Sequence, residues 1–231
     1  MHTFVMPCKF NSVIFESVKA IRKFYPNDSE IIVIDSDSED KGYIKTLRQK
    51  GIIVDDVKNK NYLTGAIWHT FKNHKRPRYY FLHDSMIIKS RLDRFINCPA
   101  TSVRYFNSGN RLGTWVPGDI KGAQGFGFDN EGSRVWAAKK LSLHTNYIIP
   151  NFFTGLFGSA LLCSRHVLEN IYAAGFSNIL PTRKIEDQTM ERLWGIALHN
   201  EGYDIKTNTI CGNHNDNPSN DVIEKRIYVR L

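Results

Sequence analysis

Over its first 85 residues the chain alternates short apolar segments with amphipathic ones. Four segments have the composition of buried strands: Thr3–Met6, Glu30–Asp35, Ile52–Val57 and Tyr79–Leu82. The segments between them predict helices: one capped by Asn11 or Ser12, one at Gly42–Lys50, and one capped by Thr64. The alternation predicts an α/β fold, with a mainly parallel, doubly wound sheet that carries helices on both faces.

The second half of the chain is less regular. Gly113–Gly132 is rich in glycine and includes Trp115, which indicates a long binding loop. A later segment repeats apolar residues with helical spacing: Met190, Leu193, Trp194, Ala197 and Leu198. Asp187 stands near the start of this helix, where a carboxylate can cap the free N–H groups. With no repeat and no linker, the 231 residues predict one domain.

Polar residues follow three of the predicted strands, at Pro7–Asn11, Asp35–Asp40 and His83–Ser85. The carboxyl ends of parallel strands share one edge of the sheet, and open α/β sheets bind ligands there. The segment after the first strand has neither the glycine pattern of dinucleotide-binding folds nor a Walker loop. The expected ligand therefore differs from those of ordinary NAD- and ATP-binding folds.

Composition narrows the class of partner. The formal charge of +8 indicates an anionic partner. The signatures of the common nucleic-acid-binding modules are missing, so we expect no nucleic acid. Four widely spaced cysteines favour a reducing compartment, and neither a signal peptide nor a transmembrane segment is recognisable. The expected location is the cytoplasm, with peripheral membrane contact still open.

Four acidic or histidine-containing motifs are candidates for chemistry. Asp84 at a strand end either caps a turn or binds Mg²⁺ or Mn²⁺, which prefer oxygen ligands. Glu186 and Asp187 are either ordinary first-turn acids or a general base for an acceptor hydroxyl. His214 is either a surface residue or a ligand from a loop near the cleft. The acidic run Asp35–Asp40 lacks the spacing of a calcium loop, which leaves recognition of base and ribose.

Taken in order, these motifs resemble the GT-A glycosyltransferases, and family 2 in particular, along nearly the whole chain. The matching segments are the Pro7–Asn11 turn, IDSDSED, FLHDSM, FTGLFGSALLCSR and IEDQTMERLWGIALHNEGY. The resemblance implies a Rossmann-like three-layer sandwich with a nucleotide-binding half (1–90) and an acceptor-binding half (91–231). It departs from the family in two places. The metal motif has one carboxylate, not two, and the first turn is one residue longer than usual.

The resemblance also implies roles for individual residues. They are nucleotide contacts at Pro7, Asn11, Asp35, Asp37, His83 and Asp84; acceptor contacts at Gly155, Gly158 and Trp115; metal ligands Asp84 and His214; and catalytic Asp187, with Glu186 the weaker candidate. The cofactor would be Mn²⁺ or Mg²⁺. The donor would be a nucleotide-diphosphate sugar, expected to be UDP-linked and to carry a hexose or deoxyhexose.

The implied reaction is a metal-assisted, inverting transfer to a hydroxyl of a glycan, glycoprotein or lipid-linked acceptor. Three alternatives stay open at this point: a nucleotide-sugar-binding protein without transfer, a nucleotidyltransferase-like enzyme, and an RNA-binding protein. The nucleotidyltransferase alternative lacks the Gly-rich basic loop expected after the first strand, where the chain has Pro7–Phe10.

Overall fold

The computed structural model describes residues 1–109, 131–150, 152–214 and 221–226. Its helices are α1 (Val13–Phe24), α2 (Gly42–Gln49), α3 (Tyr62–Asn73), α4 (Glu131–His144), α5 (Arg165–Ala173) and α6 (Lys184–Asn200), with short 3₁₀ turns η1 (Asp93–Phe95), η2 (Phe157–Ser159) and η3 (Phe176–Asn178). Its strands are β1 (His2–Cys8), β2 (Ser29–Asp35), β3 (Ile53–Asp55), β4 (Arg78–Phe81), β5 (Met86–Ile88), β6 (Ala100–Ser102), β7 (Tyr105–Gly109), β8 (Phe152–Leu156), β9 (Leu161–Ser164) and β10 (Ile223–Lys225).

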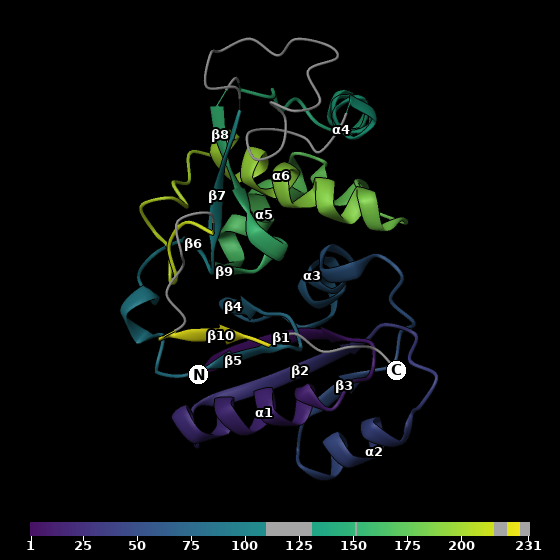
Figure 1. Cartoon of the computed structure of the whole chain (residues 1–231), viewed down its shortest axis with the longest axis vertical. Coiled ribbons are helices and arrows are strands. Elements are labelled where there is room, and N and C mark those ends of the chain that lie inside the picture. Colours follow the sequence, from purple (N-terminus) through teal and green to yellow (C-terminus); the bar gives the residue numbers. More distant parts are fainter. Residues whose placement is uncertain (110–130, 151, 215–220, 227–231) are drawn as a thin grey trace.

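Within the described residues the main sheet has six strands in the order β3-β2-β1-β4-β9-β6. Strands β3, β2, β1 and β4 are mutually parallel, and β9 runs antiparallel to both β4 and β6. Two small antiparallel pairs, β5–β10 and β7–β8, lie beside this sheet (Figure 1). The predicted α/β fold with a mainly parallel sheet is confirmed, and the second half of the chain supplies two of its strands.

Alternate residues of the central strands face opposite layers, as the two-residue period of a strand requires. Val5, Ile32 and Ile34 belong to the core that includes residues of α3, α5 and α6. Phe4, Met6 and Val33 belong to the second core, which includes residues of α1 and α2. Helices therefore cover both faces of the sheet (Figure 1), which explains why the strands are apolar almost throughout.

Pro7 belongs to β1 and not to the turn after it. The residue pairs with Ile34 of β2, whereas the pairing of β1 with β4 ends at Val5. Proline has no backbone N–H to donate, so it is tolerated where one neighbouring strand has already ended. The turn that precedes α1 is correspondingly shorter than the sequence pattern predicts.

Helix α6 is the longest helix of the described residues and lies against β8. Its five predicted apolar positions are all buried: Met190, Leu193, Trp194, Ala197 and Leu198. A Cβ on Gly195 would lie 1.8 Å from the carbonyl oxygen of Thr154 in β8, so only glycine permits this approach. Close packing of α6 on β8 places the start of the helix beside the turn that follows β8.

Two predicted helix caps are wrong. Helix α3 begins at Tyr62, so Thr64 lies inside its first turn, where its hydroxyl accepts a hydrogen bond from the Trp194 indole at 3.1 Å. Helix α6 begins at Lys184, and the capping carboxylate belongs to Glu186, not to Asp187. Glu186 accepts hydrogen bonds from the N–H groups of Thr182 and Arg183 at 2.8 and 3.2 Å.

Cys8, Cys98, Cys163 and Cys211 are free thiols in the structure, and Cys163 is buried in the core. In the part of the chain that the structure describes, no helix is both long and apolar enough to cross a membrane.

Candidate functional site

The carboxyl ends of β1 and β4 meet where the chain changes direction across the sheet. After β1 the chain continues to β2 and β3 on one side, and then returns to place β4 on the other side of β1. Such a switch point is where open α/β sheets bind ligands. Asn11, which follows β1, donates from its side-chain amide to Asp84, which follows β4, at 2.6 Å. Two of the predicted polar loops therefore meet at this point.

The third predicted loop joins them. The backbone N–H of Phe10 donates to the Ser38 hydroxyl at 2.8 Å, and the N–H of Ser36 donates to the carbonyl of Cys8 at 2.8 Å. The polar segments after β1, β2 and β4 thus form one continuous edge, as the sequence predicted.

Asp84 is held in place from two sides. Its residue is 5% exposed, and its backbone carbonyl accepts a hydrogen bond from the Ser17 hydroxyl of α1 at 2.7 Å. Asn11, which donates to its carboxylate, also accepts from the N–H of Val13 at 3.0 Å through its side-chain oxygen. Asn11, and not Ser12, therefore caps α1 through its side chain, and it connects the start of that helix to Asp84.

The Asp35 carboxylate is occupied by partners within the protein. The residue is fully buried, and its carboxylate forms an ion pair with Lys41. It also accepts hydrogen bonds from the Tyr43 hydroxyl at 2.6 Å and from the N–H groups of Asp37 and Ser38 at 3.1 and 3.3 Å. Burial alone would raise the pKa of Asp35, but these hydrogen bonds outweigh burial and lower it. Asp35 therefore orders the loop after β2, and Asp37 (φ 61°), whose side chain is 42% exposed, has a carboxylate that a ligand can reach.

His83 connects the end of β4 to the turn η2. Its Nε2 atom lies 2.6 Å from the carbonyl oxygen of Gly158, which can only accept, so this nitrogen carries the proton. Burial, followed by the charge of Lys225, lowers the pKa of His83 to about 4, so the imidazole is neutral at pH 7. Gly158 has a positive φ of 65°, and a Cβ there would lie 2.5 Å from His83 Nε2. The glycine is required both by its backbone conformation and by this contact.

Helix α6 carries two further candidate carboxylates, Asp187 and Glu191. They are four residues apart and so share one face of the helix. Burial raises the pKa of Asp187 even though Lys184 donates to it at 2.8 Å. Burial also raises the pKa of Glu191 to about 7, although Arg192 and the N–H of Gly158 oppose this shift. Sequence reasoning missed Glu191; its position one turn after Asp187 was the available signal.

The carboxylate of Glu186 caps the start of α6. Besides the two N–H groups that it caps, it accepts hydrogen bonds from the Thr182 hydroxyl at 3.0 Å and from Arg183 Nε at 2.9 Å. Burial tends to raise the pKa of Glu186, but these donors outweigh it and lower the pKa. A carboxylate with four donors and a lowered pKa is a poor proton acceptor, so α6 offers Asp187 and Glu191 as its candidate bases.

Lys225 lies among the charged groups of the site. It belongs to β10 and pairs with Met86 of β5, two residues beyond Asp84. Burial lowers the pKa of Lys225; Arg104 and Lys184 lower it further, whereas Glu191 and Asp84 oppose the change. Its ammonium lies 4.6 Å from the centre of the Phe157 ring. Sequence reasoning missed this residue because nothing local distinguishes one lysine in a short strand near the end of the chain.

His214 has features of a ligand. Its ring stacks on Phe157 with 3.7 Å between centroids, and burial lowers its pKa, followed by the charges of Arg104 and Lys225. Its Nδ1 atom is buried without a hydrogen-bond partner among the described residues. An unpaired buried nitrogen close to Lys225, which also interacts with Asp84, fits a metal ligand. Asp84 and His214 alone are a sparse set, which suits Mg²⁺ or Mn²⁺ completed by water and phosphate oxygens.

Of the three predicted acceptor contacts, one lies beside the charged groups. Gly158 contacts His83, as described above. Gly155 lies against Phe106, and a Cβ there would lie 2.3 Å from the ring. The glycine therefore allows the Phe106 ring to pack against the backbone of β8. Trp115 lies outside the described residues, as does most of the Gly-rich segment around it.

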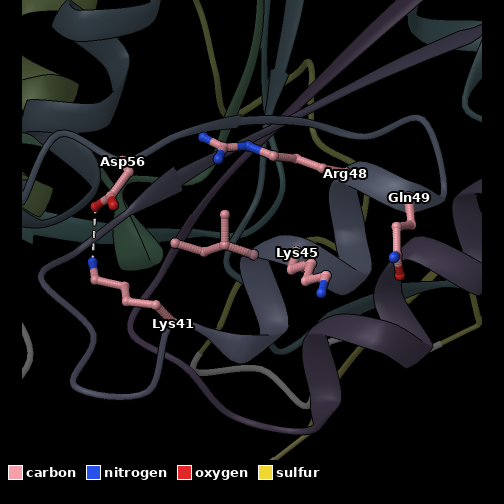
Figure 2. A pocket seen from close by; sticks show the side chains of 6 residues that line it. Lys41, Lys45, Arg48, Gln49 and Asp56 are labelled. Carbon is pink, nitrogen blue, oxygen red and sulfur yellow. Dashed lines mark hydrogen bonds and ion pairs between the residues drawn. The ribbon is translucent and has the colours of Figure 1, made fainter.

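A basic hollow of about 510 Å³ lies apart from these residues, at the edge of the sheet beside α2 (Figure 2). Lys41, Lys45 and Arg48 line it, and the dashed line in Figure 2 marks the ion pair between Lys41 and Asp56 at 2.8 Å. Lys41 also pairs with Asp35, so this hollow adjoins the loop that follows β2.

Comparison with known proteins adds little. No family model matches the sequence. No curated protein matches it either. Crystal structures of S. aureus TarS 1-349, alone and in complex with UDP, share 16% identity with the chain, cover 83% of it at a TM-score of 0.44, and are themselves covered over 55% of their length. A further TarS structure shares 14% identity at the same TM-score and is covered over 33% of its length.

The chain thus spans between a third and a little over half of the length of these TarS chains. A likeness at this identity and TM-score leaves the function to be argued from the residues of the chain itself.

Proposed function

We propose that the chain is a glycosyltransferase that binds a nucleotide-diphosphate sugar, expected to be UDP-linked, at the carboxyl ends of β1 and β4. The observation that carries the proposal is the hydrogen bond between Asn11 and Asp84 at the switch point of the sheet, with Lys225 beside it. Ligands of α/β sheets bind at this place. A carboxylate and an ammonium there suit a diphosphate and its counter-ion.

In this proposal two groups of residues have different tasks. Asp84, Asp37 and Lys225 bind the nucleotide, and Lys225 neutralises charge on the leaving diphosphate. Asp84 and His214 would hold Mn²⁺ or Mg²⁺, which when bound would supply Lewis-acid stabilisation of that charge. The exposed carboxylate of Asp37 contacts the nucleoside.

The carboxylates of α6 carry the acid–base chemistry. We assign Asp187 as the general base that takes the proton of the acceptor hydroxyl, because burial raises its pKa while Lys184 fixes its orientation. Glu191 on the same helix face is the other carboxylate with a raised pKa. Attack on the anomeric carbon from the face opposite the diphosphate would invert the configuration. The acceptor is a hydroxyl of a glycan, glycoprotein or lipid-linked sugar.

The test is calorimetry of UDP with the purified chain, with Mn²⁺ and with EDTA, followed by product analysis with UDP-sugars and simple sugar acceptors. We expect UDP to bind more tightly with Mn²⁺ and the transferred sugar to have the inverted configuration. No binding of any nucleoside diphosphate in the presence of Mn²⁺ would refute the proposal. Binding of UDP-sugars without transfer or hydrolysis would favour a binding protein, and transfer of a nucleotidyl group would favour the nucleotidyltransferase alternative.

A further inference from the structure

Asp55, His69 and His74 converge on one point beside the edge strand of the sheet. The same carboxylate oxygen of Asp55, Oδ2, lies 2.8 Å from His69 Nε2 and 2.7 Å from His74 Nε2. One ligand atom from each residue lies within 4.8 Å of the other two. Among the described residues no other group of three His, Cys, Asp or Glu side chains meets this condition.

The three residues join two elements of the fold. Asp55 is the last residue of β3, His69 lies in α3, and His74 immediately follows α3 and donates its N–H to the carbonyl of Thr70 at 2.8 Å. The cluster therefore connects the end of α3 to the edge strand. Three strand spacings separate β3 from β4 in the sheet, or about 14 Å at 4.8 Å each. The cluster is thus separate from the switch point where Asp84 lies.

Two imidazoles and one carboxylate are a ligand set of zinc, which binds three protein ligands and a water tetrahedrally. Mg²⁺ and Mn²⁺ prefer oxygen ligands and are poorly matched to two imidazoles. Tetrahedral bonds of about 2.0–2.1 Å place ligand atoms about 3.3 Å apart. Each imidazole would have to move about half an ångström away from Asp55 to admit the ion, which rotation of the side chains can supply.

The surroundings provide a neighbouring amide and an entrance from solvent. The side-chain nitrogen of Asn73 lies 3.3 Å from the other ring nitrogen of His69, Nδ1, and donates to the backbone carbonyl of His69 at 2.9 Å. His69 and Asn73 also line a surface hollow of about 480 Å³. The side chains of His69, His74 and Asp55 are 24%, 16% and 21% exposed, so an ion can enter from solvent.

We propose that Asp55, His69 and His74 form a zinc site that fastens the carboxyl-terminal end of α3 to edge strand β3, with water as the fourth ligand. Without the ion the same residues form a His–Asp–His hydrogen-bonded group. Binding of zinc takes the place of the two Nε2–H hydrogen bonds to Asp55: each neutral imidazole then binds the ion through Nε2 and carries its proton on Nδ1. The inference does not rest on the glycosyltransferase proposal.

The experiment titrates Zn²⁺ into chelator-treated, tag-free protein by calorimetry, in the presence of excess Mg²⁺ and in a His214→Ala background, which removes the imidazole of the other predicted metal site. We expect one zinc per chain and a rise in Tm. His69→Gln with His74→Gln should abolish the binding, and Asp55→Asn should weaken it at least tenfold. His166→Gln is the matched control, because His166 is exposed on α5 and should leave binding unchanged.

X-ray absorption of the zinc-loaded protein gives a second reading, and two imidazole ligands are expected. This measurement also tests the zinc site if the double variant does not fold, because it uses the chain with all three residues intact. Absence of stoichiometric zinc, an absorption spectrum without imidazole, or binding unaffected by Asp55→Asn in folded protein would each overturn the proposal.

Discussion

The imidazole Nε2–H of His83 donates a hydrogen bond to the backbone carbonyl of Gly158 at 2.6 Å. This bond ties the loop after β4 to the turn η2. The N–H of Gly158 in turn interacts with the carboxylate of Glu191 in α6 and opposes the rise of its pKa. One glycine thus connects the loop that carries Asp84 to the helix that carries the candidate bases.

Gly158→Ala tests this connection. A Cβ at φ 65° would lie 2.5 Å from His83 Nε2, so the substitution strains the backbone and displaces the imidazole. We expect a loss of more than about 1–2 kcal/mol in free energy of unfolding, which is the backbone cost alone. Gly202→Ala is the matched control, because Gly202 has φ 79° and open space around it. Denaturant unfolding that gives equal losses in both variants would contradict the role of the His83 contact.

Asp84→Asn should abolish the dependence of UDP binding on Mn²⁺, because the change removes the charge and keeps the shape and the hydrogen bond to Asn11. His214→Ala should weaken the metal dependence less. The control is Asp93→Asn, an exposed aspartate that pairs with Arg91 near the opposite ends of the strands. Calorimetry in which Asp84→Asn binds UDP and Mn²⁺ like the parent would show that the metal assignment is wrong.

Lys225→Gln should weaken UDP binding about 10- to 100-fold, because a hydrogen bond to a charged group contributes about 1.5–3 kcal/mol. The binding of the parent should also depend more steeply on salt than that of the variant. Lys206→Gln, at an exposed lysine outside the site, is the comparison. Unchanged affinity in Lys225→Gln would place the diphosphate elsewhere.

Asp187→Asn should lower turnover about 10²- to 10⁴-fold, the usual cost of losing a positioned general base, with little change in UDP affinity. Glu186→Gln should retain turnover and lower stability by about 1 kcal/mol, because Glu186 caps α6. Rates and Tm are measured together so that the two effects separate. If Glu191→Gln stops the reaction while Asp187→Asn does not, the base is Glu191.

Glu191 should also make stability depend on pH. Its pKa rises from an ordinary value of 4.5 to about 7 in the folded chain. A raised carboxyl pKa means that its contribution is fully present below about pH 4.5 and is lost as the pH rises through about 7, at a cost of up to about 3 kcal/mol. Glu191→Gln should therefore be more stable than the parent at pH 8 and similar at pH 4. Thermal unfolding at both pH values checks this, with exposed Glu169→Gln as the control.

Much of the fold is a local property of the sequence. The apolar runs that form β1, β2 and β4 and the periodic spacing of α1 and α6 predict these elements, because a buried strand is apolar on both faces and a helix repeats every 3.6 residues. The polar strand ends predict the edge where Asn11 and Asp84 meet. The two wrong caps, at Thr64 and Asp187, show the limit, since several polar residues near a helix start compete for the same N–H groups.

The sequence by itself determined the parallel α/β sheet and the place of the candidate site, because both follow from periodicity and from the order of strands along the chain. Only the tertiary structure decided which side chains are available there. It enclosed the Asp35 carboxylate with Tyr43 of the following helix, assigned Glu186 to the backbone at the start of α6, and brought Lys225 close to both Asp84 and Glu191. It also joined Asp55 to two histidines. The contacts of Lys225 and Asp55, and the burial of these side chains, depend on residues far apart in the chain, and no local pattern encodes them.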